Sequence, residues 1–120
     1  MQPFRDLQVW RKAHELTLRI YTITENFPRV ETFGLSAQLR RLSVTIPLRI
    51  AEGCGRENQI EFHKCLQQAR ATGFELEYLF LLGRDLQLIE PVTYENLQSQ
   101  LIEVRKMLSG LIKSTAAAAV

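Results

Sequence analysis

A chain of 120 residues has room for one domain with a modest core. Its apolar content of 46% and charged content of 23% are those of an ordinary soluble domain. The sequence contains no apolar run near the roughly 18 to 20 residues that a membrane-spanning helix needs, and its first residues lack the apolar segment of a secretion signal. We therefore expect residues 1–120 to form a single cytoplasmic domain without membrane association.

The net charge of +2 hides an uneven distribution. Residues 1–56 hold nine Lys or Arg against five Asp or Glu, whereas residues 57–120 hold six against eight. The excess in the first half weakly favours an anionic partner. The two cysteines, Cys54 and Cys65, are eleven positions apart and form no CxxC pair, which favours two reduced thiols over a disulfide.

The first helix is predicted over about residues 6–26, with Asp6 as its N-cap and Pro28 beyond its end. Spacings of four and three separate its apolar residues: Val9, Ala13, Leu16, Ile20, Ile23 and Phe27. Trp10 lies off this seam and widens the apolar face. We interpret it as a core or subunit contact, which is how large aromatic side chains are most often used.

The second helix is predicted over about residues 34–52. One face carries its apolar seam: Leu35, Leu39, Leu42, Ile46 and Ile50. Pro47 falls inside the pattern, and a kink is expected there because proline has no N–H to donate. Gly53 and Gly55 are expected to end the helix in the left-handed conformation that glycine adopts at least cost.

Two further strips run along this second helix. Val44, Leu48 and Ala51 form a second apolar strip, which a helix in a lone bundle does not need. Between the two apolar sides, a rotation of about 100° per residue gathers a mostly basic stripe: Arg41, Thr45, Arg49, Glu52 and Arg56. The second apolar strip suggests a partner surface.

The third helix is predicted over about residues 59–86 and starts with a capping box of Asn58 and Glu61. Its seam keeps strict four-three spacing: Phe62, Leu66, Ala69, Gly73, Leu76, Phe80 and Gly83. The two glycines let a neighbouring helix approach closely. Phe74 and Tyr78, followed by Leu81 and Leu82, form a second apolar strip here as well.

The fourth helix is predicted over about residues 94–113, with Thr93 as N-cap and Pro91 as the stop of the third helix. Its seam is regular: Leu97, Leu101, Val104, Leu108 and Leu111. The low-complexity tail, residues 114–120, either extends this helix or frays. Four amphipathic helices without any alternating strand pattern predict an all-α, antiparallel up-down-up-down four-helix bundle.

Enzyme chemistry finds little support in the residues. His14 and His63 are on different predicted helices, and no HExxH or CxxC motif supplies further metal ligands. Cys54 has no evident base or oxyanion site beside it. We therefore assign no catalytic residue, no metal site and no cofactor.

Nucleic-acid binding is the first functional hypothesis. Four arginines of the central stretch could contact phosphates: Arg40, Arg41, Arg49 and Arg56. A second cluster on the first helix consists of Arg5, Arg11, Lys12 and Arg19, and of these Arg11 and Lys12 are assigned to the site. Such contacts give little sequence specificity. In the alternative, a protein–protein scaffold, the same arginines form salt bridges with Glu52 or Glu61 between subunits. Simple pairing within the chain, or solvation, also remains open.

Several motifs together resemble a known family. They are F-R-D-L-Q-V-W-R-K-A at residues 4–13, F-P at 27–28, E-T-F-G-L at 31–35, Q-L-R-R at 38–41, T-I-P at 45–47, I-A-E-G at 50–53, G-R at 55–56, E-F at 61–62 and E-L at 75–76. The chain resembles the small bacterial four-helix bundle proteins encoded within intervening sequences of 23S ribosomal RNA genes. It is also similar to the accessory variability proteins of diversity-generating retroelements.

This resemblance implies a cyclic homo-oligomer, a pentamer, which agrees with the surplus apolar strips. We expect Trp10, Val44, Leu48, Phe74 and Tyr78 in the subunit interfaces. In the retroelement relatives a basic surface of the pentamer binds nucleic acid and a reverse transcriptase. The sequence departs from the family pattern at Arg49, where Asn is usual, and at Ala71-Thr72, where Gly-Ser is usual. Arg49 adds a positive charge to the stripe and removes any polar contact that the usual Asn makes.

Overall fold

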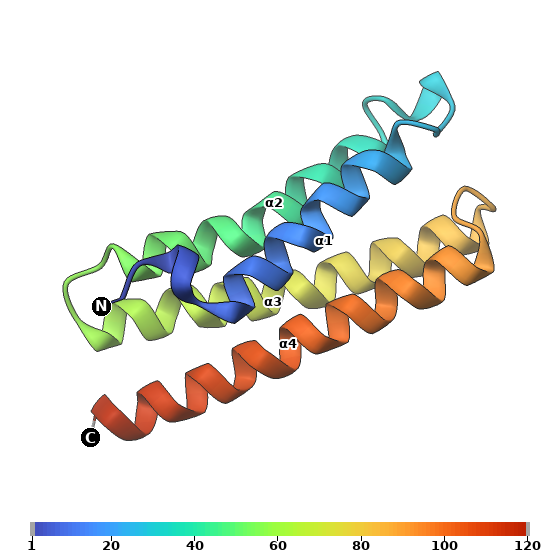
Figure 1. Ribbon diagram of the computed structural model, residues 1–120. Helices are drawn as coiled ribbons and strands as arrows, with labels where there is room; N and C mark the ends of the chain where they lie inside the picture. The colour runs from blue at the N-terminus through green and yellow to red at the C-terminus, as the bar shows by residue number, and fades with distance from the viewer. Residues whose placement is uncertain (1, 120) are drawn as a thin grey trace.

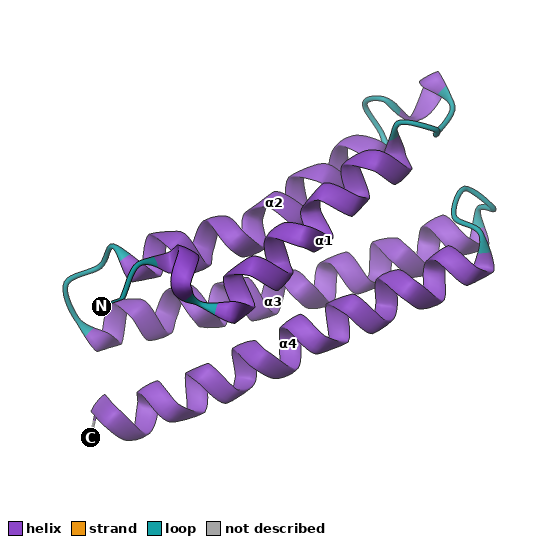
Figure 2. Ribbon diagram, viewed as in Figure 1, coloured by secondary structure: helices purple, strands orange, loops and turns teal. Residues whose placement is uncertain are grey.

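The structure is a computed structural model that describes residues 2–119, with side chains as far as Thr115. Within this range the chain forms four α-helices and two short 3-10 helices, and it contains no strand (Figures 1 and 2). In chain order these elements are η1 (Phe4–Asp6), α1 (Gln8–Thr24), η2 (Arg29–Glu31), α2 (Leu35–Cys54), α3 (Gln59–Asp85) and α4 (Pro91–Ala119).

The helices run alternately up and down, and each contacts two neighbours. α2 packs on α1 and α3, and α4 packs on α3 and α1. The α1–α2 and α3–α4 connections lie at one end of the bundle, and the α2–α3 connection lies at the other end with both termini (Figure 1). The predicted all-α up-down-up-down bundle is therefore confirmed, with overall dimensions of 48 × 22 × 20 Å.

The predicted seams fill the core. Each helix contributes residues at spacings of three and four, so their side chains meet along the bundle axis. Fully buried members from all four helices include Leu16, Ile20, Leu39, Ile46, Ile50, Leu66, Leu76, Phe80, Leu97 and Leu101. In α4 the seam ends on the buried Ile112, while the predicted member Leu111 is only half-buried. No helix of the described residues is long and apolar enough to cross a membrane.

The start of α1 differs from the prediction. Asp6 belongs to η1, and the N-cap of α1 is Leu7, which makes no side-chain capping bond. The helix also ends two residues early, at Thr24. At that end the Thr24 hydroxyl donates to the carbonyl of Ile20 (2.8 Å) and accepts from the Nε of Arg40 (2.7 Å). Side-chain hydrogen bonds are therefore present at the end of α1, where the backbone hydrogen bonds of the helix stop.

The glycines at the end of α2 act differently from the prediction. The helix includes Gly53 and ends at Cys54, and Gly55 has φ −87° rather than a left-handed conformation. No glycine of the described residues has positive φ. Gly53 is required for close packing instead, because a Cβ there would lie 3.0 Å from Cys65 Cβ and from the Phe62 ring on α3. Pro47 is buried inside α2.

The two ends of α3 are capped in different ways. Asn58 Oδ1 accepts a hydrogen bond from the Glu61 N–H (2.9 Å), which is the first half of the predicted capping box. At the other end Gln87 has φ 63°, and the N–H of Leu88 reaches back to the Gly83 carbonyl (2.9 Å). This is the hydrogen-bond pattern of a Schellman motif, with glutamine in the position that usually belongs to glycine.

Helix α4 begins earlier and ends later than predicted. Pro91 is its first residue rather than the stop of α3, because proline suits a first helical turn, whose N–H groups have no partner in the helix. Thr93 is therefore inside the helix and is not its N-cap. The low-complexity tail extends the helix to Ala119, so that alternative is the one the described residues support.

Candidate nucleic-acid interface on helix α2

The three sides of α2 have different neighbours. Its seam faces the core, and Ser43 meets α1 through a hydrogen bond from the Thr17 hydroxyl to its carbonyl (2.7 Å). By helical rotation Arg41, Arg49 and Arg56 lie on the opposite flank of the seam, toward α3. We call these three residues, with Thr45 and Glu52 between them, the arginine stripe.

One carboxylate holds two of the three arginines. Glu52 Oε1 accepts from Arg49 Nη1 (3.2 Å), and Glu52 Oε2 accepts from Arg56 Nη2 (2.7 Å). The hydrogen bond with Glu52 raises the pKa of Arg56 above its ordinary value. Arg41 is exposed and forms no ion pair with the described residues. Three cations and one anion leave the stripe positive overall.

Arg40 is engaged elsewhere. Its guanidinium donates to the Thr24 hydroxyl (2.7 Å) and to the Tyr21 carbonyl (3.3 Å), and it lies 4.6 Å from the centroid of the Tyr21 ring. These contacts place a cation at the C-terminus of α1, where the helix dipole favours positive charge. Of the four predicted arginines of the central stretch, Arg40 therefore belongs to the α1–α2 contact and not to the stripe.

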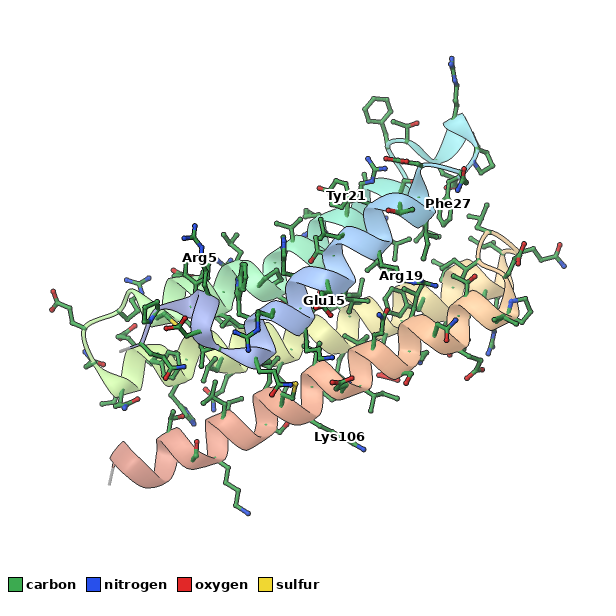
Figure 3. All side chains as sticks on the ribbon, in the orientation of Figure 1. Arg5, Glu15, Arg19, Tyr21, Phe27 and Lys106 are labelled. Atoms are coloured by element: carbon green, nitrogen blue, oxygen red, sulfur yellow. The ribbon has the colours of Figure 1, made fainter. Side chains whose placement is uncertain are left out.

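The two predicted cations of α1 are on another side of the bundle. Lys12 Nζ lies 3.5 Å from Glu103 Oε1 on α4, and Arg11 donates to the carbonyl of Arg5 (2.9 Å). Figure 3 shows the same division on α1, with Tyr21 on the side of α2 and Arg19 on the side of α4. The structure thus brings Arg41, Arg49 and Arg56 together and leaves Arg11 and Lys12 apart from them.

The α1–α2 hairpin also carries an apolar groove on its outer face. Its cavity volume is about 460 Å³, and its lining comes from η1, α1 and α2: Phe4, Trp10, Leu18, Tyr21, Val44 and Leu48 are among the residues. Trp10 is half-buried, with its ring stacked on that of His14 at 5.0 Å. Sequence reasoning missed Phe4, because it precedes the periodic segment and only the fold of η1 brings it to the groove.

The α3–α4 hairpin carries a second exposed apolar patch, which we call the α3 strip and define as Phe74, Tyr78 and Ile102. Phe74 and Tyr78 are one helical turn apart and are 60% and 59% exposed. Arg105 of α4 lies with its guanidinium 4.4 Å from the Phe74 ring centroid and pairs with Glu77. A seam glycine makes room for it, since a Cβ on Gly73 would lie 3.0 Å from Arg105 Cγ. All five predicted interface residues are thus at least partly uncovered in the single chain.

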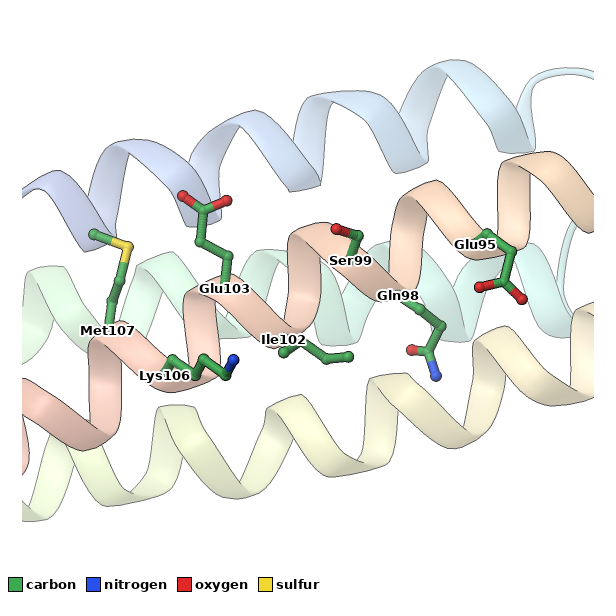
Figure 4. Close-up of a pocket in the computed structure, with 7 residues that line it drawn as sticks. All are labelled: Glu95, Gln98, Ser99, Ile102, Glu103, Lys106 and Met107. Carbon is green, nitrogen blue, oxygen red and sulfur yellow. The ribbon is translucent and has the colours of Figure 1, made fainter.

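A hollow along α4 has a volume of about 500 Å³. Figure 4 shows its lining on this one helix: Glu95, Gln98, Ser99, Ile102, Glu103, Lys106 and Met107. Its charged groups include Glu103, which is paired with Lys12, and among the described residues Ser99 forms no hydrogen bond with Glu95 or Glu103, one turn away. We therefore assign this hollow no chemistry.

Metal and thiol chemistry find no site among the described residues. No group of three or more His, Cys, Asp or Glu is placed to hold a metal ion in that part of the chain. Cys54 and Cys65 are free thiols, and Cys65 is buried. Burial raises the pKa of the Cys54 thiol, so its reactive thiolate form is disfavoured.

Comparison with known proteins identifies the family. The family model described as 23S rRNA-intervening sequence protein matches residues 5–110. The chain belongs to this family. The match confirms the resemblance drawn from the motifs at residues 4–13, 31–35 and 50–53.

A similar solved structure supports the assignment of the chain to the 23S rRNA-intervening sequence protein family. The chain is similar to a protein of unknown function from the S23 ribosomal protein family of Bacteroides thetaiotaomicron VPI-5482, with a TM-score of 0.81 and 25% sequence identity. The similarity covers 88% of this chain and 95% of that one. No curated protein sequence matches the chain. The family description and the description of the similar structure name no enzymatic activity.

Proposed function

We propose that this member of the 23S rRNA-intervening sequence protein family is a non-enzymatic homo-oligomer that binds RNA or DNA through phosphate contacts to the arginine stripe. The observation that carries the proposal is the convergence of Arg41, Arg49 and Arg56 on one side of α2, with Glu52 as the carboxylate between them. Arginine presents a planar fork of donors that matches phosphate oxygens. The family description refers to 23S rRNA and names no bound molecule.

Repetition of the stripe in an oligomer would strengthen its field. One stripe has a small net charge, and a half-exposed ion pair within one helix such as Arg49–Glu52 contributes little to folding stability. A phosphate can therefore compete with Glu52 for these arginines at modest cost. Copies of the stripe around a ring would add their potentials. The ring that we propose is a pentamer, and a protein partner such as a reverse transcriptase follows from family resemblance alone. The two free thiols suit a reducing cytoplasm.

The alternative function, a protein–protein scaffold, uses the same arginines in subunit contacts. In the single chain Glu52 is already paired within its own helix, so a salt bridge from Glu52 to another subunit would have to displace these contacts, as a phosphate would. Glu61, the other carboxylate considered, lies 3.7 Å from Lys64. A second subunit would have to compete with both existing contacts.

Fluorescence anisotropy tests the proposal directly. The purified protein is titrated into a labelled structured RNA and a labelled DNA duplex at about 50 and 200 mM salt. We expect binding to both, with an affinity that falls steeply with salt because phosphate contacts release counterions. Absence of binding at the lower salt contradicts the proposal and directs attention to a protein partner.

A further inference from the structure

We propose that a hollow between α3 and α4 binds a terminal phosphate group, as carried by a nucleotide or by the end of a nucleic-acid strand. We call it the α3–α4 hollow and define it by its lining: Arg70, Phe74, Ile102, Arg105, Lys106 and Ser109. The arginine stripe is on α2, so this is a separate site. The proposal goes beyond the proposed function and depends neither on the stripe nor on the oligomer.

The lining of the α3–α4 hollow is cationic. Three of its six residues carry a positive charge, and none of the six is acidic. Residues 57–120 as a whole have the opposite balance, with six Lys or Arg against eight Asp or Glu. Half of the cations in this acidic part of the chain therefore line one hollow. A local excess of one sign of charge in a hollow attracts an ion of the other sign.

Two of these three cations have no carboxylate partner. Arg70 and Lys106 form no ion pair with the described residues. Glu103, one turn before Lys106, is paired with Lys12 instead (3.5 Å). The positions three and four residues to either side of Arg70 hold no acid. An anion from outside the chain can therefore pair with both cations without displacing a carboxylate, whereas at the arginine stripe it has to displace Glu52.

The donors of the hollow come from two helices. Arg70 Nη1 of α3 lies 3.5 Å from Ser109 Oγ of α4. Lys106 precedes Ser109 by three residues, so it lies one turn away on the same face of α4. Figure 4 shows Lys106 on the side of α4 that faces α3. A guanidinium, an ammonium and a hydroxyl group thus surround one space between the two helices.

Arg105 supplies a wall of the hollow and an unused donor. Its guanidinium pairs with Glu77 and lies 4.4 Å from the centroid of the Phe74 ring, and these two contacts hold it in place. Its Nε is buried and has no hydrogen-bond partner among the described residues. A buried donor without an acceptor is costly. An oxygen atom bound beside Arg105 would supply that acceptor.

Charge and size favour a terminal phosphate over other anions. A phosphate monoester has a charge of about −1.5 to −2 near neutral pH and three acceptor oxygens, which suits two unpaired cations and a hydroxyl group. A phosphate within a nucleic-acid backbone carries one charge, as a carboxylate does, and would leave one cation unpaired. The volume of about 370 Å³ is near the lower end of the range for small-ligand sites, roughly 300–1,000 Å³.

Titration of the isotope-labelled protein, followed by nuclear magnetic resonance, tests the site. Inorganic phosphate and adenosine 5′-monophosphate are the ligands, and adenosine and acetate at equal ionic strength are the controls. We expect saturable shifts of the amide signals of Arg70, Lys106 and Ser109 with both phosphate ligands and with neither control.

A double substitution links the binding to the two cations. Arg70→Gln combined with Lys106→Gln should weaken phosphate binding by about tenfold or more, because charged hydrogen-bond donors are lost. Arg29→Gln combined with Lys113→Gln removes two exposed cations outside the hollow and should bind phosphate as the wild type does. Circular dichroism checks that both variants keep their helix content.

Two oligonucleotides of one sequence, with a 5′-phosphate or a 5′-hydroxyl end, distinguish the sources of the phosphate. If the phosphorylated strand binds several-fold more tightly, and the Arg70 and Lys106 double variant loses this difference, the ligand is the end of a strand. If both strands bind alike while adenosine 5′-monophosphate still binds at the hollow, the ligand is a free phosphorylated compound.

Three results would overturn the proposal. They are the absence of phosphate-induced shifts at the hollow, an undiminished phosphate affinity in the Arg70 and Lys106 double variant, and equal shifts with acetate. The last result would favour carboxylates, such as those of an acidic protein partner. A protein that binds no oligonucleotide but still binds phosphate at the hollow would lose the proposed function and keep this site.

Discussion

Two phenylalanines of α3 show how one helix serves two purposes. Phe80 is completely buried in the core, whereas Phe74, six positions earlier, is 60% exposed on the outer strip. They share a residue type and a helix, but they differ by rotation about its axis. The buried ring contributes to the fold of each subunit, and the exposed ring remains available for a partner. A chain with more apolar surface than its own core needs therefore carries information about assembly as well as folding.

Truncation of the two rings, one at a time, is expected to give the largest difference in the free energy of unfolding. Phe80→Ala removes a buried ring and leaves a cavity, so the free energy of unfolding should fall by about 3–5 kcal/mol. Phe74→Ala should cost a single subunit little, because its ring is mostly in solvent. Urea denaturation at two protein concentrations about tenfold apart measures both effects.

The concentration dependence sharpens this comparison. A loss that is the same at both concentrations belongs to the fold of the subunit, and this is expected for Phe80→Ala. A decrease in the urea midpoint that depends on protein concentration reports on assembly of the oligomer, and this is expected for Phe74→Ala. A large, concentration-independent loss for Phe74→Ala would show that the outer strip supports the fold itself.

The same division extends to α2, where the seam is buried and the arginine stripe is outside. Arg41→Glu combined with Arg56→Glu reverses two exposed charges of the stripe. Binding to RNA or DNA should weaken by about 100-fold or more, because two phosphate contacts are lost and two repulsions are added. Anisotropy measures the affinity, and light scattering checks that the oligomer survives.

The two readouts distinguish the two functions. An intact oligomer that no longer binds supports the nucleic-acid interface. Dissociation of the oligomer places the arginines in subunit contacts and favours the scaffold. A matched control is Arg29→Glu combined with Lys113→Glu, two exposed cations outside the stripe, which should reduce affinity far less.

Removal of the Glu52 carboxylate should change the affinity for nucleic acid less than the double arginine substitution does, and should raise it. Glu52→Gln keeps the shape of the side chain but releases Arg49 and Arg56 from their shared ion pair. Affinity for nucleic acid should rise several-fold, and the salt dependence should steepen by about one phosphate contact. Glu95→Gln, an exposed carboxylate on α4, changes the net charge equally and serves as the control. An equal gain from both variants would mean that overall charge, rather than the stripe, governs binding.

Periodicity predicted what depends on spacing. The seams of all four helices were found because side chains three and four positions apart must share a face, and the exposed positions of Leu48, Phe74 and Tyr78 follow from the same rule. The stripe of Arg41, Arg49 and Arg56 was found for this reason too.

The sequence predicts the Asn58 cap of α3, but it does not predict the start of α1 or the contacts between helices. Asp6 is a good N-cap by composition, but the chain forms η1 first and α1 starts at Gln8. The contact of Arg40 with Thr24 and the pairing of Lys12 with Glu103 join different helices, so rotation along one helix could not reveal them. The sequence predicts that Gly53 ends α2 in a left-handed conformation, whereas its actual role, close contact with Phe62 and Cys65, depends on where α3 lies.

The end of α3 offers the smallest effect and the only expected gain in stability. Gln87 has φ 63°, a conformation that costs a residue with a Cβ about 1 kcal/mol. Gln87→Gly removes that cost but gives the unfolded chain more freedom, so a net gain of about 0.5 kcal/mol is expected in urea denaturation. Gln87 is exposed, outside the groove, the strip and the arginine stripe, so assembly and nucleic-acid affinity should not change.

A loss of stability instead would mean that the glutamine side chain contributes more to the α3–α4 connection than its backbone conformation costs. Since Leu88 and Ile89 both donate to the Gly83 carbonyl within this turn, that outcome would place the rigidity of the connection in side-chain packing rather than in the backbone bonds.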